Sequence, residues 1–250
     1  MLALIGSNGF VGRNLNLQMR FDVGVSSKGV ALLEGQALEL LVCAGTSAEK
    51  WRANADPAAD WRAIKRLMVS LSRIQTQRMV LISTIDVYPQ TLKSDERLAD
   101  YDAQQQHAYG RHRRALEEFV IAQFPAALIV RLPALYGLGL KKNALFDLIH
   151  RHNLGALNAA ASFQWYGLQR LGADLERALA AGLQVVNLFP EPLELGELAA
   201  RFFADVTLSY DAHSAARYAL TTIHAELFGG SNGWIENRAQ VLSSLAHFLR

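Results

Sequence analysis

The sequence has very little cysteine and no long uninterrupted hydrophobic segment. Its single cysteine, Cys43, cannot form an internal disulfide, which is typical of proteins from a reducing compartment. No run approaches the roughly 18 apolar residues that a membrane span requires, and residues 1–12 lack the basic leader of a secretory signal. These absences predict a cytoplasmic protein that has no membrane partner.

Charge of one sign is also scarce. The chain has 25 Lys and Arg against 23 Asp and Glu, a net charge of +2, and its basic residues are scattered rather than clustered. This balance gives no basis for predicting a nucleic-acid partner. His150 and His152 have no carboxylate or cysteine at suggestive spacing, so no metal site is predicted.

What the chain does have is 51% hydrophobic residues over 250 positions, enough to bury a substantial core. Apolar runs typical of buried strands alternate with segments of helical period. The predicted strands are 2–5, 21–26, 38–45, 78–83, 126–133 and 183–189, and the predicted helices are 10–20, 60–75, 109–124, 173–182, 193–204, 213–228 and 235–249. Asp60 is the expected start of one helix. This order predicts an α/β fold with a Rossmann-type doubly wound parallel sheet.

A glycine-rich loop, GSNGFVG at 6–12, joins the first predicted strand to the first predicted helix. Glycines at this point let the chain turn, let a diphosphate approach the backbone and let the helix pack closely on the strand. The spacing is a variant of the common dinucleotide fingerprint, and an ordinary strand–helix turn is the alternative interpretation. The candidate cofactor-binding residues of the loop are Gly6, Asn8, Gly9, Phe10, Val11 and Gly12.

The end of the second predicted strand is where an acidic residue usually binds the adenosine ribose of NAD. This chain has Ser26, Ser27 and Lys28 there, with no carboxylate. These residues could hold a 2′-phosphate, with help from Arg13, so NADP is slightly favoured over NAD; a solvated loop lysine is the alternative. The small residues of the segment Cys43, Ala44 and Gly45 are expected to line the cofactor groove, although Cys43 in its apolar strand is also expected to be buried.

The chain resembles the extended short-chain dehydrogenase/reductase family, which contains NAD-dependent epimerases, dehydratases and nucleotide-sugar reductases. The likeness covers nearly the whole chain, and the motifs follow in the family's order. They are GSNGFVG at 6–12, STIDVYP at 83–89, YGRHR at 109–113, RLPALYGLG at 131–139 and VVNLFPEPLELGELA at 185–199. The resemblance implies one NAD(P)-binding domain over 1–250, with a small substrate-binding lobe formed mainly by about 136–166 and 190–250.

The resemblance also implies the catalytic set. The family's Ser or Thr after a strand falls on Thr84, its tyrosine on Tyr109, and its lysine, four residues after the tyrosine, on Arg113. Ser83 and Pro133 fall where the family contacts the cofactor, and Arg113 falls where the family's lysine binds the cofactor ribose.

The chemistry of these roles can be argued from the residues themselves. Hydride transfer at a carbon that bears oxygen needs a proton donor or acceptor at that oxygen. The pKa of a free tyrosine is about 10, so a nearby cation is needed to favour the phenolate at neutral pH. Positions 109 and 113 share a helix face, and Thr84 can hydrogen-bond the same substrate oxygen.

Arg113 is the departure from the family pattern. Its guanidinium keeps the positive charge but is bulkier than an ammonium and deprotonates far less readily.

Two hypotheses about the function follow. The first is an NAD(P)-dependent oxidoreductase or epimerase that acts on a sugar or nucleotide-sugar-like alcohol or ketone, with Asp86 and Asn143 as candidate substrate-binding residues. The second is a dinucleotide-binding regulatory or assembly protein with lost or weak catalysis. The family's habit also predicts a homodimer formed through helices 60–75 and 109–124.

Overall fold

Six short apolar segments form one sheet in the computed structural model, which describes residues 1–89, 91–98 and 106–250. The strand order is β2-β1-β3-β4-β5-β9. The strands are β1 (Leu2–Ile5), β2 (Val23–Val25), β3 (Leu38–Cys43), β4 (Thr76–Thr84), β5 (Ala127–Leu132) and β9 (Val185–Asn187). β1 pairs in parallel with both β2 and β3, and β3 pairs in parallel with β4. The predicted Rossmann-type sheet is confirmed, and the strand order reverses between β1 and β3, where sheets of this kind bind ligands.

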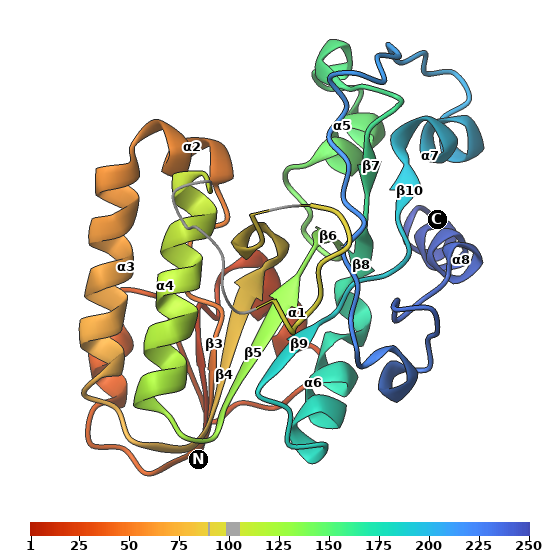
Figure 1. Cartoon of the computed structure of the whole chain (residues 1–250). Helices are drawn as coiled ribbons and strands as arrows, with labels where there is room; N and C mark the ends of the chain where they lie inside the picture. Colours follow the sequence, from red (N-terminus) through yellow and green to blue (C-terminus); the bar gives the residue numbers. More distant parts are fainter. Residues whose placement is uncertain (90, 99–105) are drawn as a thin grey trace. The chain divides into compact units, whose positions relative to one another are not determined.

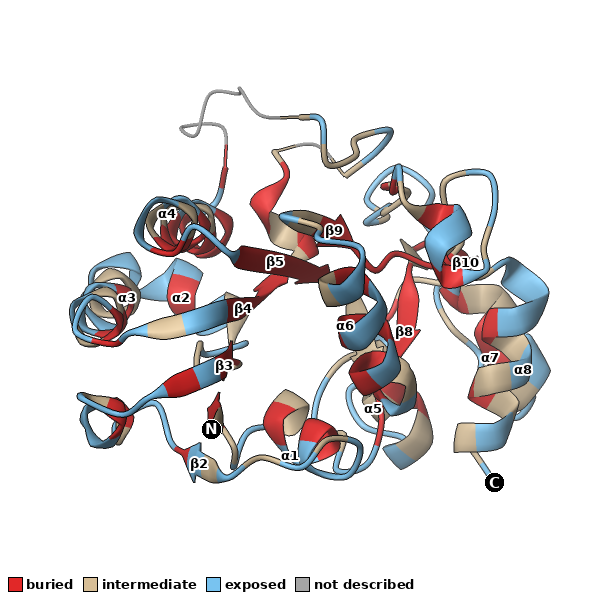
Figure 2. Cartoon of the chain, turned by 90° about the horizontal axis from the view of Figure 1, so that it is seen from below, coloured by how far each residue is buried: buried red, intermediate tan, exposed pale blue. Residues whose placement is uncertain are grey.

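Helices cover both faces of this sheet. Figures 1 and 2 show α3 (Pro57–Leu71) and α4 (Ala108–Gln123) on one face and α1 (Phe10–Asn16) and α6 (Leu171–Ala180) on the other. The short helix α2 (Lys50–Ala55) contacts both α3 and α4. The sheet is therefore doubly wound, as the alternating sequence pattern predicts.

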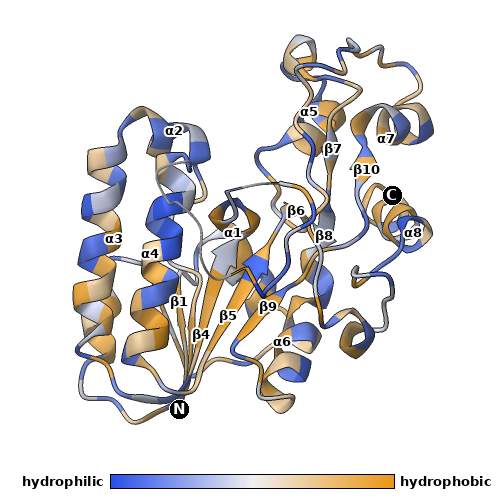
Figure 3. Cartoon of the chain, viewed as in Figure 1, coloured by the Kyte–Doolittle hydropathy of each residue, from blue (hydrophilic) through white to orange (hydrophobic). Residues whose placement is uncertain are grey.

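The main core lies between the sheet and helices α3 and α4. Strand residues such as Leu41, Met79 and Leu81 are fully buried there, and Figure 3 shows the hydrophobic strands. The helices contribute one apolar stripe each, namely Ile64, Leu67 and Leu71 from α3 and Leu116 and Val120 from α4. Their spacing of three and four residues is that of a single helix face.

The described chain divides into two compact units. The first comprises Met1–Pro89, Leu98–Arg131 and Arg170–Val186, and holds the sheet. The second comprises Gln90–Arg97, Leu132–Gln169 and Asn187–Arg250. The predicted substrate lobe of about 136–166 and 190–250 falls within the second unit, and its substrate-binding role stays a prediction.

The second unit has its own small sheets and core. β6 (Ala134–Tyr136) pairs in parallel with β8 (Trp165–Gly167), and β7 (Ser162–Phe163) pairs antiparallel with β10 (Leu193–Glu194). The helices of this unit are α5 (Ala144–His150), α7 (Leu195–Phe202) and α8 (Arg238–Phe248). Tyr136 and Trp165 are buried among leucines of all three helices. Short 3₁₀ turns lie at Val30–Leu33, Ile85–Val87, Leu154–Ala156, Leu168–Arg170 and Ala225–Phe228.

Two helix predictions need correction. The helix predicted over 213–228 is wrong, apart from the 3₁₀ turn Ala225–Phe228. Its backbone bonds elsewhere: the Ser162 N–H donates to the Ala216 carbonyl, and the Tyr218 N–H donates to the Ser162 carbonyl. These long-range bonds use groups that a helix would need for itself.

The other correction concerns the start of α3. The predicted start signal, Asp60, lies inside the first turn, and the true N-cap is Asp56, whose carboxylate accepts from the Ala59 N–H at 2.9 Å. Pro57 follows at the first helical position, where a missing N–H costs nothing. Asp60 is thereby left available for a contact with α4. The unpredicted helix α2 precedes this cap.

Candidate functional site

The glycine loop is shaped by three close backbone approaches. Gly6 has φ +84°, and its N–H donates to the Val25 carbonyl at 2.7 Å. A Cβ on Gly6 would lie 2.3 Å from the Ala44 carbonyl oxygen, and one on Gly12 would lie 2.1 Å from the Gly6 carbonyl oxygen. Only glycine fits at these two positions. The loop therefore brings the carboxyl ends of β1, β2 and β3 together, as a dinucleotide site at this edge requires.

The outer part of the loop is open to solvent. Asn8 and Gly9 are exposed, and Phe10 and Val11 are half-buried. Gly9 begins α1 with an extended backbone and has no side chain with which to cap it, while its own N–H donates to the Gly6 carbonyl at 2.8 Å. The first N–H groups of a helix lack partners within the helix, so the first turn of α1 can donate to an anion.

The ends of the neighbouring strands differ in exposure. Ser26, Ser27 and Lys28 are all exposed in the turn after β2, where the Lys28 N–H donates to Ser26 Oγ at 3.3 Å. At the end of β3, Cys43 is fully buried in the main core, and this burial raises the pKa of its thiol to about 11. The cysteine side chain therefore faces the core, and the half-buried Ala44 and Gly45 form the surface of this segment.

The structure brings Thr84 and Tyr109 together within the first unit. Thr84 ends β4, and Tyr109 lies in the first turn of α4 with only 6% of its surface exposed. The Thr84 hydroxyl is near enough to act on the pKa of the Tyr109 phenol. Burial raises the pKa of Tyr109 above its ordinary value, although the Arg113 charge and the Thr84 hydroxyl both act to lower it. The phenol is thus held neutral beside the threonine hydroxyl.

Two residues that the sequence reasoning missed fix the start of α4. His107 is its N-cap, and Nδ1 of this histidine accepts from the Gly110 N–H at 3.1 Å. Asn54, on α2, accepts from the Tyr109 N–H at 3.0 Å. A residue with a side-chain acceptor just before a helix is a signal that could have identified His107. No sequence signal connects Asn54 to a residue 55 positions away.

Gly110 permits a very close approach of α4 to the chain after β4. A Cβ at this position would lie 2.0 Å from the Asp86 carbonyl oxygen. Because Tyr109 precedes Gly110 and Thr84 lies two residues before Asp86, this approach sets the separation of the two candidate catalytic residues. The sequence reasoning quoted Gly110 but gave it no role.

Arg113 points away from solvent and is tightly bound. Its Nη1 donates to the Asp60 carboxylate at 2.5 Å and its Nη2 to the Ser47 carbonyl at 2.7 Å. The guanidinium carbon lies 3.9 Å from the centre of the Tyr109 ring, a cation–π contact. The arginine therefore serves Tyr109 as a fixed charge on the ring face. Its assignment to the cofactor ribose stays a prediction.

Asp60 anchors this arginine. The carboxylate also lies 2.7 Å from His112 Nδ1, and its side chain is only 8% exposed. Burial alone would raise the pKa of Asp60, but the hydrogen bonds from Arg113 and His112 outweigh it and hold the pKa below its ordinary value. Asp60 is thus ionised at neutral pH and neutralises the charge of Arg113.

Asp86 forms a second charged group next to Tyr109. Its carboxylate lies 2.6 Å from Lys50 Nζ and 3.6 Å from His107 Nε2. Burial acts to raise the pKa of Asp86, yet the His107 hydrogen bond and the Lys50 charge keep it below the ordinary value. Lys50 was not among the predicted residues, because 36 positions separate it from Asp86. A substrate-binding role for Asp86 stays a prediction.

Ser83 faces a buried ionic network rather than the surface. Its hydroxyl donates to Glu117 at 2.5 Å, and Arg131 binds the same carboxylate through two nitrogens. Arg131 also donates to the Tyr88 hydroxyl at 2.8 Å. Burial acts to lower the pKa of Arg131, but the charge and hydrogen bonds of Glu117, together with Tyr88, outweigh it and raise the pKa. The network ties β4, α4 and β5 together beneath Thr84.

Pro133 and Asn143 belong to the second unit. Pro133 follows β5 directly and is half-buried. Asn143 has φ +127° and caps α5: its amide oxygen accepts from the Phe146 N–H at 3.1 Å, and its amide nitrogen donates to the Leu135 carbonyl at 2.8 Å. The structure gives Asn143 a local capping role, and its substrate-binding role stays a prediction.

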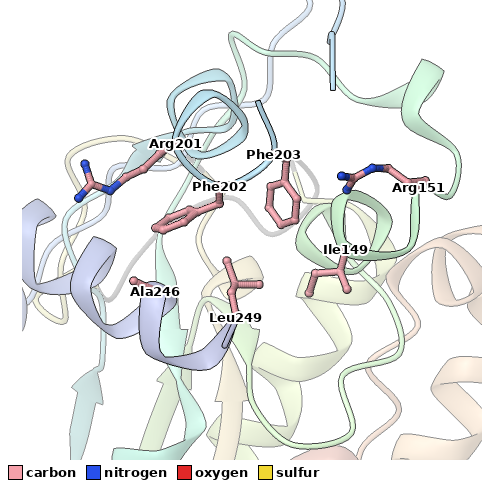
Figure 4. Close-up of a pocket in the computed structure, with 7 residues that line it drawn as sticks. All are labelled: Ile149, Arg151, Arg201, Phe202, Phe203, Ala246 and Leu249. Atoms are coloured by element: carbon pink, nitrogen blue, oxygen red, sulfur yellow. The ribbon is translucent and has the colours of Figure 1, made fainter. Parts of the chain in front are cut away.

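The second unit also contains a pocket of about 500 Å³. Figure 4 shows its lining side chains, which come from α5, α7 and α8 and the residues that follow them. They are Ile149, Arg151, Arg201, Phe202, Phe203, Ala246 and Leu249. None of the predicted site residues is among them.

Within residues 1–89, 91–98 and 106–250, no group of three or more His, Cys, Asp or Glu side chains could hold a metal ion. Within the same residues, no helix is both long and apolar enough to cross a membrane.

Comparisons with known proteins identify the fold. No protein-family model and no curated sequence matches the chain. Among solved structures, a dTDP-4-dehydrorhamnose reductase from Clostridium acetobutylicum ATCC 824 is similar, with a TM-score of 0.77 and 17% identity, over 100% of this chain and 98% of that one. The same enzyme from Bacillus anthracis str. Ames, in complex with NADP, gives 0.76 and 15%, over 99% and 97%.

A UDP-glucose 4-epimerase from Thermotoga maritima gives a TM-score of 0.73 and 13% identity, over 99% of this chain and 97% of that one. At these identities the likeness shows a shared fold. The neighbours are reductases and epimerases of the kinds that the motif resemblance names.

Gly110→Ala tests the close approach of α4. We expect the added methyl group to push against the Asp86 carbonyl and to lower the free energy of unfolding by about 1–3 kcal/mol, the usual cost of overpacking. Chemical denaturation followed by circular dichroism measures the change.

The matched control is Gly155→Ala, because a Cβ at Gly155 has no neighbour within 4 Å. Its unfolding free energy should stay close to that of the wild type. Equal stability of the two variants would contradict the packing role of Gly110.

Proposed function

We propose that the chain is an NAD(P)-dependent oxidoreductase or epimerase that acts by hydride transfer on a sugar or nucleotide-sugar-like alcohol or ketone. The observation that carries the proposal is the close approach of α4 to the chain after β4 at Gly110, which brings Tyr109 near Thr84. This pair stands at the carboxyl end of β4, in the same unit as the glycine loop. Neighbours of the same fold are reductases, epimerases and dehydratases, and some are described in complex with NADP, NADPH or NAD.

Each side chain of the pair has a distinct task in this proposal. The Tyr109 hydroxyl donates a proton to the substrate oxygen, or accepts one in the reverse direction. Thr84 hydrogen-bonds the same oxygen and orients it. Arg113, on the face of the Tyr109 ring, favours the phenolate that forms when the proton leaves. A bound nicotinamide would supply or accept the hydride.

The cofactor would lie along the carboxyl ends of the strands. The loop Gly6–Gly12 offers close backbone approach, and the half-buried Ala44 and Gly45 offer a surface with little side-chain bulk. The exposed Lys28, with Ser26 and Ser27, supports a preference for NADP, because an ammonium and two hydroxyls can bind a 2′-phosphate.

A second candidate function is a dinucleotide-binding regulatory or assembly protein. The observation that favours it is the commitment of Arg113 to Asp60 and to the Ser47 carbonyl. A guanidinium held in this way cannot exchange protons as a lysine does. In this alternative the chain binds the cofactor but turns no substrate over.

Three further features belong to the proposal. The second unit would bind the substrate, with Asn143 among its contacts.

The chain would form a homodimer through helices 60–75 and 109–124. In the structure α3 and α4 contact each other, and Val69 of α3 is 54% exposed. Light scattering would measure the mass. A cytoplasmic location would suit its single, fully buried cysteine.

Tyr109→Phe separates the two candidate functions. It removes only the phenol hydroxyl, so we expect cofactor affinity to stay within about twofold and turnover to fall about 100-fold or more, the usual contribution of an acid–base group. Fluorescence titration with NADPH and NADH measures binding, and absorbance at the nicotinamide band measures turnover with a panel of nucleotide-linked keto sugars.

Arg113→Lys is the companion variant, since it restores the family's ammonium. Tight cofactor binding without turnover in the wild type and in Arg113→Lys would favour the regulatory alternative. Absence of binding to either cofactor would overturn both candidates.

Lys28→Ala tests the cofactor preference. We expect the dissociation constant for NADPH to rise about fivefold or more, because a charge-assisted contact worth at least ~1 kcal/mol is lost. The dissociation constant for NADH should not change, since NADH has no 2′-phosphate. Isothermal titration calorimetry with both cofactors measures the two constants. Equal weakening for NADPH and NADH would contradict the assignment of Lys28.

A further inference from the structure

Two cations from different helices act on Tyr109, and their surroundings differ. Arg113, on α4, is buried, with 3% of its side chain exposed. Lys50, at the start of α2, keeps 38% of its side chain exposed and forms an ion pair with Asp86 at 2.6 Å. One cation is thus sealed inside the first unit, and the other remains accessible to solvent.

Arg113 can supply only a fixed charge. Its two terminal nitrogens are bonded to Asp60 and to the Ser47 carbonyl, and its guanidinium carbon lies 3.9 Å from the centre of the Tyr109 ring. Release of either bond would leave a buried ionic or polar group without its partner, which is costly. The arginine therefore keeps its position through any change at the phenol.

Lys50 is held in place by Asp86, and the backbone of Asp86 contacts Thr84 and Gly110. The Asp86 N–H donates to Thr84 Oγ1 at 3.2 Å, and the Asp86 carbonyl oxygen faces the Cα of Gly110, next to Tyr109. The carboxylate of Asp86 holds the Lys50 ammonium from this fixed backbone. The lysine is thereby tied to the position of the pair although it comes from another helix.

We propose that Lys50 is a positioning residue for Tyr109, and that Lys50 and Arg113 together perform the tasks of one lysine. Arg113 supplies the constant charge on the ring face. Lys50 supplies a solvent-accessible ammonium held by Asp86, and an ammonium with three donors can serve both a carboxylate and a hydroxyl of a bound ligand. This inference rests on the proposed function, since it assigns Lys50 to the same acid–base site.

The electrostatics of Tyr109 agree with this assignment. Burial is the main cause that raises its pKa; the charges of Arg113 and Lys50 act to lower it, and the charge of Asp86 acts to raise it. His107 lies with its ring centre 6.2 Å from that of Tyr109 and contacts Asp86. Asp60 binds Arg113, and His112 contacts Asp60. Loss of Lys50 removes a cation and leaves the Asp86 charge less compensated, so both effects raise the pKa.

The test is the ionisation of Tyr109 in Lys50→Met. Fluorinated tyrosine, incorporated throughout the full-length protein, lowers the pKa of every tyrosine below that of the unmodified residue, and ¹⁹F NMR follows each residue. The Tyr109 signal is assigned by its loss in Tyr109→Phe. We expect Lys50→Met to raise the Tyr109 pKa by about half a unit or more, and Lys50→Arg to restore most of the wild-type value.

The matched control is Lys65→Met, which removes an exposed lysine from α3, where it lies over the Trp61 ring. It should leave the Tyr109 pKa unchanged. An equal Tyr109 pKa in wild type, Lys50→Met and Lys65→Met would overturn the proposal. Because this titration needs no cofactor or substrate, its failure is separate from a failure of the proposed function, which would appear as absent NADPH and NADH binding in the wild type.

Discussion

The close approach of α4 to the chain that follows β4 is the constraint on which the candidate site depends. Gly110 has no Cβ, so the helix can pass within contact distance of the Asp86 carbonyl. This approach places Tyr109 beside Thr84 and at the same time places Arg113 opposite Asp60 on α3. A larger side chain at Gly110 would separate Tyr109 from Thr84. It would also disturb the Arg113–Asp60 and Lys50–Asp86 ion pairs.

Around this contact, the first unit arranges its charges in three groups. Arg113 pairs with Asp60, Lys50 pairs with Asp86, and Arg131 pairs with Glu117 beneath the strand ends. The first two pairs link elements that are distant in the sequence, and the third links the consecutive elements α4 and β5. Buried pairs such as Arg113–Asp60 and Arg131–Glu117 add little net stability compared with apolar packing, but breaking one of them is costly. They therefore serve to fix the positions of α2, α3, α4 and β5 around the phenol.

The arginine at position 113 fits its surroundings in this structure for a plain physical reason. The guanidinium forms a fork with donors in fixed directions, and the structure provides one carboxylate and one carbonyl in those directions. Asp60 can take this role because Asp56, four residues earlier, already caps α3. The arginine at position 113 is thus matched by Asp60 on α3 and by the Ser47 carbonyl in the loop between β3 and α2.

The alternation of strands and helices, the glycine loop and the pairing of positions 109 and 113 on one helix face could all be predicted from the amino-acid sequence. These features are local, because hydrophobic period, turn residues and helical spacing act within a few residues. Other features became known only from the folded chain: Ser83 faces a buried carboxylate, residues 213–228 bond to other segments, and Lys50, Asp60 and Asp86 surround the candidate pair. These outcomes depend on contacts between residues many positions apart, and no periodicity or spacing in the chain encodes such contacts.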